Sequence, residues 1–340
     1  MFGRGRCLGA ALAIAGSVAS GGFAAAQEVR LGIPVVSFTV SPIYIADELG
    51  YWTKSGLQVK FPLIPGVGVN NALAAGSIEF AYGSAPTMIR GNARDQKTVA
   101  IATALNRVQL ELIMSKSAAA AAGITESSPI EKKAQAMRGR KMGVDSINSV
   151  VHSYLRYVAR KGGVDPERDI TVTSLQGPAG LAAIKNGSID GFTMSLPWTL
   201  IPVHEGTAIR LVSSPRSDLP ELEPFVYTVI LARPGYCDRD ESICRRLVAG
   251  LTQAYGYLHD HPRESLEIIR KRIPSTVDPQ VFNEAFELMR ASTPRTAHID
   301  AAGFAKAQDY MVATGMMKQE ERLPSIEAVY TNKFTGGGPR

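Results

Sequence analysis

The chain has 340 residues, 45% of them hydrophobic and 20% charged, and its formal net charge is +6 at pH 7. This length suits one large or two medium domains. Acidic and basic residues are mixed and the net charge is small, which argues against a nucleic-acid-binding protein.

Residues 1–26 are expected to be a cleaved secretory signal peptide. Arg4 and Arg6 precede an apolar stretch over 8–18, and Ala24-Ala25-Ala26 suits signal peptidase. The stretch is shorter than the ~20 residues of a membrane helix, and no Leu-x-Gly-Cys arrangement follows it. We therefore expect export to the periplasm without a membrane or lipid anchor. Loss of the two arginines leaves a mature chain of charge +4.

From residue 28 the chain alternates between strand-like and helix-like patterns. Hydrophobic runs separated by amphipathic helices are typical of a largely parallel sheet covered on both faces. The predicted strands are 28–33, 58–63, 78–82, 98–104 and 110–114, and the predicted helices are 41–54, 70–75 and 85–91.

A polar, alanine-rich stretch over 115–133 indicates an exposed connection, after which the α/β pattern restarts. The C-terminal quarter is helical and ends in a glycine-rich tail. A helix end and turn feeding a strand are predicted over 136–144. The further predicted strands are 169–174, 190–194, 209–212 and 225–232, and the predicted helices are 150–161, 176–186, 242–258, 262–271, 279–289 and 301–314.

The two halves repeat one design. Residues 73–80 and 182–192 each read as a helix, a glycine, and then Ser-Ile, an acidic residue and Phe entering a strand. Two similar α/β lobes joined by two crossing segments would make a hinged clamshell with the ligand between the lobes.

Several motifs carry a family resemblance: Pro42-Ile43-Tyr44-Ile45-Ala46, the Gly56-Leu57 strand entry, Leu73 to Phe80, and Gly139 to Val144. Their order resembles periplasmic solute-binding proteins of the nitrate/sulfonate/taurine group, with the NMT1/THI5-like fold. The resemblance implies an α/β, periplasmic-binding-protein-like clamshell with a two-segment hinge. We expect lobe 1 over 27–114 plus 229–334, lobe 2 over 115–228, a flexible tail over 335–340, and hinges near 112–116 and 227–232.

Ligand contacts are predicted where strands end and helices begin, because helix N-termini offer unpaired N–H groups. The same serines and asparagines are also ordinary helix caps, and Tyr44 could equally face the core. The candidate ligand-binding residues are Ser37, Phe38, Thr39, Tyr44, Gly83, Ser84, Asn106, Ser146, Asn148, Ser149, Ser195, Pro197 and Trp198.

The ligand class follows in part from a departure from the family. Many relatives have Glu-Pro in the last cleft loop, where this chain has Leu196-Pro197. An apolar residue there weakens the case for a pyrimidine or thiamine precursor. It favours a small organic acid, such as a sulfonate or carboxylate, held by backbone N–H groups, although the identity of the ligand stays open.

Cys237 and Cys244 remain after processing, and an oxidising periplasm favours a disulfide between them over two free thiols. The five histidines are scattered, no carboxylate or cysteine cluster has metal-ligand spacing, and there is no Gly-x-Ser-x-Gly elbow. We therefore expect neither an enzyme nor a metal or cofactor site.

The resemblance implies a monomeric binding component of an ABC importer that docks on a membrane permease driven by an ATPase. An alternative from another class is a ligand-sensing periplasmic protein that docks on a receptor.

Overall fold

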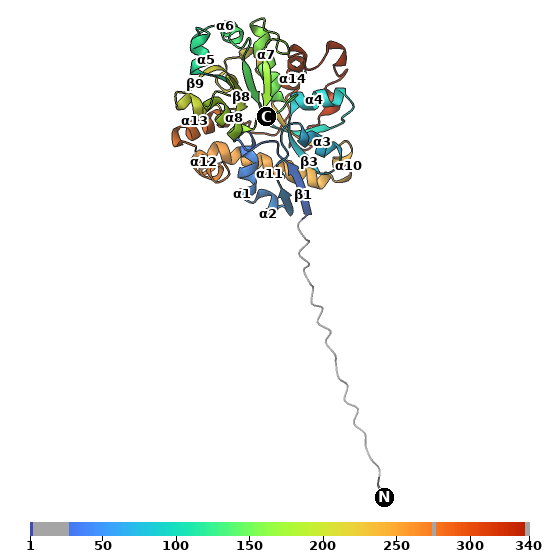
Figure 1. Ribbon diagram of the computed structural model, residues 1–340. Helices are drawn as coiled ribbons and strands as arrows, with labels where there is room; N and C mark the ends of the chain where they lie inside the picture. Colours follow the sequence, from blue (N-terminus) through green and yellow to red (C-terminus); the bar gives the residue numbers. More distant parts are fainter. Residues whose placement is uncertain (3–26, 274–276, 337–340) are drawn as a thin grey trace.

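The computed structural model describes residues 1–2, 27–273 and 277–336, which form two α/β lobes (Figure 1). Most of the predicted signal peptide, 3–26, and the end of the predicted tail, 337–340, lie outside the described residues. The tail does not begin at 335 as predicted. Thr335 is buried, and its Oγ1 donates to the carbonyl of Asn332 at 3.0 Å.

The first lobe is built on a five-stranded sheet of order β2-β1-β3-β10-β4. β1 runs parallel to β2 and β3, whereas β10, which arrives from the far side of the second lobe, is antiparallel to β3 and β4. The strands are β1 Gln27–Gly32, β2 Leu57–Lys60, β3 Phe80–Ser84, β4 Val99–Leu105 and β10 Thr228–Ala232.

Helices from both ends of the chain cover this sheet. The longest, α11 (Glu241–Asp260), is amphipathic and buries a face against α1 and α2. Trp52 donates from Nε1 to the carbonyl of Leu247 at 2.9 Å, and Gly250 makes room for its ring. The helices are η1 Phe38–Val40, α1 Ser41–Glu48, α2 Tyr51–Lys54, α3 Gly68–Ala74, α4 Ala85–Ala93, α10 Tyr236–Arg239, α11, α12 Pro262–Arg270, α13 Pro279–Arg290, α14 Ala301–Ala313, η4 Gln319–Glu321 and η5 Glu327–Val329.

The second lobe has a five-stranded sheet of order β7-β6-β8-β5-β9. Its strands are β5 Leu110–Ser115, β6 Lys141–Val144, β7 Thr171–Ser174, β8 Gly191–Ser195 and β9 Ala208–Ser213. Its helices are α5 Lys116–Ala121, α6 Ile130–Gln135, α7 Val150–Lys161, α8 Gly177–Lys185, α9 Leu200–His204, η2 Ser214–Arg216 and η3 Pro220–Leu222.

The two sheets locate the crossings between the lobes. β5 pairs with β8 and β9, so the prediction that 110–114 belongs to the first lobe is wrong. The chain first crosses over 106–109 and returns over 214–227, upstream of the predicted 112–116 and at the edge of the predicted 227–232. A hydrophobic run predicts a strand but not its partners, because the pattern of one strand is the same in either sheet.

The predicted repeat is present in the backbone. After α3 and α8 the chain turns at Gly76 and Gly187, with φ of 78° and 75°, a left-handed conformation that favours glycine. Ser77 N and Ser188 N donate back to helix carbonyls at 2.9 Å in the same way. The predicted disulfide is also present, since Cys237 on α10 is bonded to Cys244 on α11.

Candidate ligand-binding site

A cavity of about 70 Å³ lies between the lobes, at the ends of β3 and β8 and the start of β10. Its lining includes one carboxylate, several hydroxyls and an amide, and no lysine, arginine or histidine of the described residues lines it. The lining residues are Pro34, Val35, Thr39, Gly66, Val67, Val69, Asn70, Tyr82, Gly83, Ser84, Thr87, Asp145, Ser149, Val150, Val151, Met194, Ser195, Tyr227 and Thr228.

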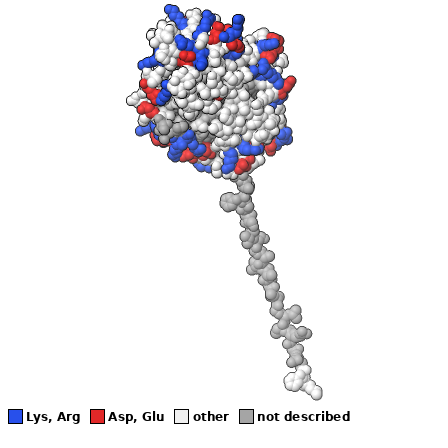
Figure 2. All heavy atoms as spheres, viewed as in Figure 1, with Lys and Arg blue, Asp and Glu red and all other residues white. Residues whose placement is uncertain are grey.

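Apart from Asp145, the charged residues of the described chain lie away from the cavity lining. Figure 2 shows lysine and arginine interspersed with aspartate and glutamate around the edge of one face, with an uncharged area between them. No single sign of charge dominates this face.

On the first-lobe side, hydroxyls near η1 are bonded to one another. Ser37 caps η1 and lies 2.6 Å, Oγ to Oγ1, from Thr39. The Tyr82 hydroxyl donates to the carbonyl of Thr39 and lies 3.0 Å from Thr228 Oγ1. Burial raises the pKa of Tyr82, so it stays a neutral donor. The hydroxyls on this side of the cavity are therefore held in place, and most of their hydrogen-bonding capacity is already used.

The N-terminus of α4 is also already occupied. Ser84 caps the helix by accepting from Thr87 N at 3.3 Å, and Ala85 N donates to the carbonyl of Tyr227 at 2.9 Å. Pro86 has no N–H. Among the described residues, the first turn of α4 therefore offers no free backbone N–H to an anion, contrary to the reasoning that selected this loop from the sequence.

Asn70, on α3, brings an unsatisfied polar atom to the first-lobe side of the cavity. Its side chain is buried, only 4% exposed, and its Oδ1 has no hydrogen-bond partner among the described residues. Gly83 lies against it, since a Cβ there would be 3.1 Å from Asn70 Oδ1 and 2.8 Å from Leu231 Cδ1. The glycine thus keeps this part of the cavity open.

On the second-lobe side, Asp145 follows β6 and faces the cavity ahead of α7. Its Oδ1 accepts from Ser146 N at 2.6 Å and from Ser149 Oγ at 2.5 Å. Burial raises the pKa of the Asp145 carboxyl to about 6, although these hydrogen bonds act in the opposite direction. Ser149 also caps α7, accepting from His152 N at 3.1 Å.

Tyr227 closes the cavity beside Asp145. It is buried, and burial raises its pKa, to which the nearby Asp145 carboxylate adds. No hydrogen bond of its hydroxyl is found within the described ranges, so this group is available to a ligand.

The structure brings five of the predicted residues together around the cavity, and Ser37 lies directly behind them. The five are Thr39, Gly83, Ser84, Ser149 and Ser195. The predictions thus include residues from both lobes.

The remaining predicted residues do not line the cavity. Phe38 packs in the core with its ring 4.8 Å from that of Phe282. Tyr44 is buried beneath Arg272, whose guanidinium lies 5.9 Å from its ring centre. Asn106 is exposed in the first crossing. Asn148 is exposed too, in a left-handed turn with φ of 66°.

Ser146, Pro197 and Trp198 lie at the contact between the lobes. A Cβ at Gly66 would be only 2.5 Å from Ser146 Cβ, so these two residues touch across the cleft. Trp198 Nε1 donates to the carbonyl of Val36 at 3.3 Å, and Phe38 N to that of Leu196 at 3.2 Å. Trp198 lines a neighbouring groove rather than the cavity itself, and this groove combines apolar residues with three cationic ones, Arg270, Lys271 and Arg272.

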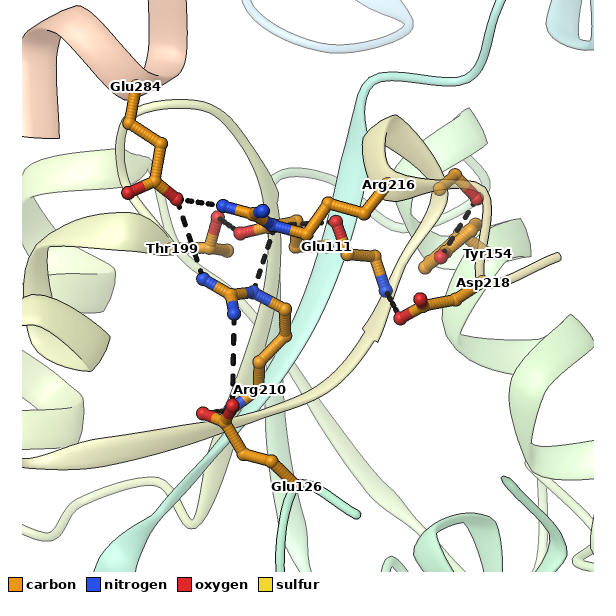
Figure 3. A network of polar contacts seen from close by, with 10 residues as sticks. Glu111, Glu126, Tyr154, Thr199, Arg210, Arg216, Asp218 and Glu284 are labelled. Atoms are coloured by element: carbon orange, nitrogen blue, oxygen red, sulfur yellow. Dashed lines mark hydrogen bonds and ion pairs between the residues drawn. The ribbon is translucent and has the colours of Figure 1, made fainter. Parts of the chain in front are cut away.

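A charged cluster also joins the lobes, away from the cavity. Figure 3 shows Arg210 and Arg216 of the second lobe pointing toward Glu284 on α13, with Glu111 between them. Glu111 is fully buried. Together with the Trp198 and Ser146 contacts, this cluster holds the two lobes against each other.

Sequence reasoning missed Asn70, Tyr82, Thr87, Asp145, Tyr227 and Thr228. Asp145 stood directly between a predicted strand and the serine loop, and Tyr82 ended a predicted strand, so strand-end position alone would have found both. Asn70 and Tyr227 carry no such signal. Their unused hydrogen-bonding capacity is visible only in three dimensions.

With this geometry established, comparison with known proteins gives the family. The NMT1/THI5-like family profile matches residues 37–265. The chain belongs to this family. The two-lobed architecture is the fold of periplasmic binding proteins, as the sequence predicted.

Individual relatives of this NMT1/THI5-like chain are distant. The bicarbonate transport ATP-binding protein CmpC of Synechocystis sp. is 24% identical over 245 residues, 69% of this chain and 35% of CmpC. This chain therefore spans about a third of CmpC.

Two solved structures share the fold. The alkanesulfonate-binding protein SsuA from Xanthomonas axonopodis pv. citri, bound to MOPS, has 18% identity and a TM-score of 0.68, over 90% of this chain and 98% of SsuA. The desulfurization enzyme DSZB has 14% identity and a TM-score of 0.59, over 91% and 97%. Identities this low show the fold alone.

Proposed function

We propose that this protein is the substrate-binding component of an ABC importer, capturing a small polar molecule between its lobes and delivering it to a membrane permease driven by an ATPase. The observation that carries the proposal is the cavity of about 70 Å³, which residues of both lobes line. Contacts across the cleft, such as Gly66 on Ser146, close over it.

Ligand exchange then requires the lobes to separate. The segments 106–109 and 214–227 connect the two sheets and would act as the hinge. A ligand that contacts both lobes stabilises the closed arrangement over the open one, and a permease could distinguish the two by shape.

Export and a monomeric state belong to the same proposal. The sequence over 1–26 supports cleavage after Ala26, and the disulfide between Cys237 and Cys244 suits an oxidising compartment. Within 27–273 and 277–336, no helix combines the length and apolar character needed to cross a bilayer.

A binding role also accounts for the cavity better than catalysis does. Its ionisable groups are Asp145 and two tyrosines, Tyr82 and Tyr227, and burial keeps both tyrosines protonated. The hydroxyl bonded to the Asp145 carboxylate, that of Ser149, is also the cap of α7, since it accepts from His152 N. This pair is therefore accounted for by the local fold without catalysis. The fold does not decide this point, since DSZB shares it and is an enzyme.

The charge of the cavity does not support the small acid predicted from the sequence. A sulfonate or carboxylate would enter a cavity whose one charged side chain is Asp145 and which has no cationic side chain to balance it. An acidic ligand would also meet an α4 N-terminus whose N–H groups are already bonded.

The test is to purify the protein under native conditions from its own periplasm and identify what it carries by native mass spectrometry. Adding this compound to stripped protein should reduce the radius of gyration in small-angle X-ray scattering, and deleting the protein should abolish uptake of the compound. Gly83→Ala should weaken binding, because the new methyl would meet Leu231 and Asn70. Gly256→Ala is the matched control, as its methyl would enter open space. No compaction, or unchanged uptake, would contradict the proposal.

A further inference from the structure

We propose that Asp145, opposed by Asn70 from the other lobe, selects a small ligand that donates N–H hydrogen bonds, such as an amidine or an amine, in preference to an acid. The inference rests on the proposed function and concerns the ligand class of that same cavity.

The first step is the unused capacity of the Asp145 carboxylate. Both of its side-chain hydrogen bonds, from Ser146 N and Ser149 Oγ, end on Oδ1. In the described part of the chain, Oδ2 receives no hydrogen bond and the carboxylate has no ion pair. A carboxylate oxygen can accept two hydrogen bonds, so Oδ2 is a free acceptor at the cavity.

The second step is that this charge is partly enclosed, because Asp145 is half-buried at the cavity. An ionised group removed from water without a partner is costly, and proteins normally pair it. The raised pKa of Asp145, about 6, is consistent with this cost and leaves the group ionised at neutral pH. A bound N–H donor would supply the partner that the protein lacks.

The third step concerns the first-lobe wall of the cavity, which lies opposite Asp145. Asn70 comes from the first lobe, is only 4% exposed, and leaves its amide oxygen without a partner. It lines the same cavity as Asp145 and the unbonded Tyr227 hydroxyl. Two acceptors on opposite lobes suit a ligand that donates in two directions, and such a ligand would hold the lobes together.

The fourth step excludes a simple anion. The positive end of α7 lies at this wall, but Asp145 is directly beside it and offsets its partial charge. A fully ionised acid would therefore lie next to a carboxylate without a compensating cation.

The experiment uses matched pairs of equal shape: acetamidine against acetate, and benzamidine against benzoate. Affinities are measured by ligand-observed NMR at pH 7.5 on the mature protein. We expect an amidine to bind about tenfold or more tightly than its acid partner, because a hydrogen bond to a charged group is among the stronger ones.

The variant Asp145→Asn should remove this preference, with about a tenfold loss for the amidine. Its amide oxygen can still accept from Ser146 N and Ser149 Oγ, so the start of α7 is preserved. The matched control is Asp95→Asn, which changes an exposed carboxylate on the first lobe and should leave both affinities unchanged.

Lowering the pH gives a readout that a purely structural role would not produce. Amidine binding should weaken about tenfold between pH 7.5 and pH 5 as Asp145 is protonated. Tyr227 and Tyr82, the other titratable groups that line the cavity in the described structure, stay neutral throughout. Burial lowers the pKa of His152, on the adjoining α7, to about 4, so it stays largely neutral at pH 5.

The proposal is overturned if no amidine exceeds its acid partner in the wild type, whether the acid binds better or neither binds. It is also overturned if Asp145→Asn leaves the preference intact. If an acid binds in this cavity and compacts the protein, the proposed N–H-donating ligand class is wrong, but the proposed transport function is not contradicted.

Discussion

Two carboxylates of the second lobe are treated in opposite ways. Glu111 is fully buried and accepts from Thr199 Oγ1 at 2.8 Å, Ser213 Oγ at 2.6 Å and Arg210 Nε at 3.2 Å (Figure 3). Within the part of the chain that the structure describes, the Asp145 carboxylate accepts two hydrogen bonds, both on one oxygen, and pairs with no cation. The protein itself satisfies a structural carboxylate, whereas it leaves capacity free in the one that faces the cavity. Unused hydrogen-bonding capacity distinguishes these two carboxylates better than burial does.

The largest effect should come from removing the satisfied carboxylate. Glu111→Ala leaves Arg210 without its closest partner and two hydroxyls without an acceptor, so we expect the free energy of unfolding to fall by about 3–5 kcal/mol. Urea unfolding followed by circular dichroism measures it.

The control for this change is Glu205→Ala, which removes a carboxylate from an exposed pair with Lys185. Surface pairs contribute little, so its cost should stay below about 1 kcal/mol. Equal losses for the two variants would mean that the Glu111 cluster stabilises the protein no more than a surface pair.

Removing the charge of Asp145 should raise the free energy of unfolding, whereas removing Glu111 lowers it. Its pKa rises on folding from 3.8 to about 6, so between these pH values the folded protein holds more protons than the unfolded chain. The free energy of unfolding therefore falls as pH rises through this window and then levels off. Asp145→Asn should remove this dependence and stabilise the ligand-free protein at pH 7 by about 1–2 kcal/mol.

Thermal unfolding between pH 4 and pH 8 tests this expectation, with Asp95→Asn as the exposed control. A destabilised Asp145→Asn variant at neutral pH would show that the carboxylate supports the fold, as Glu111 does, rather than being held ready for a ligand.

The smallest effect on stability is expected at the contact between the lobes. Arg216 and Glu284 are both partly exposed and pair across the cleft, so Glu284→Gln should change the free energy of unfolding by no more than about 1 kcal/mol. It should nevertheless favour separated lobes, which small-angle X-ray scattering would detect as a larger radius of gyration. An unchanged scattering profile would assign closure to the Trp198 and Ser146 contacts instead.

The sequence predicted most of the fold because its signals are local. Alternating hydrophobic runs gave the strands, and the Ser-Ile-acid repeat after Gly76 and Gly187 gave two equivalent lobes. The position of β5 was missed, since its hydrophobic run fits either sheet and the choice depends on pairing with β8 and β9.

The site was predicted only in part, for a related reason. Helix-cap serines such as Ser84 and Ser149 are recognisable from sequence, and both line the cavity. The sequence does not show whether such a serine already caps its own helix. Ser84 does, because it accepts from Thr87 N. Asp145 and Asn70 are candidate ligand contacts because each has an oxygen without a hydrogen-bond partner in the described structure. That property depends on all the neighbours of the side chain, which the sequence does not show.

The place of β10 has a consequence for how the chain matures. The second sheet uses one continuous stretch, β5 to β9, and can be completed as soon as residue 213 is available. The first sheet cannot, because β10 inserts between β3 and β4 more than a hundred residues after β4. If the chain is exported as proposed, β3 and β4 would each lie with an open edge while it passes through the membrane, and such edges are where strands aggregate. The first lobe thus begins to leave the membrane first but completes its sheet last. A periplasmic chaperone would be needed at its exposed strand edges.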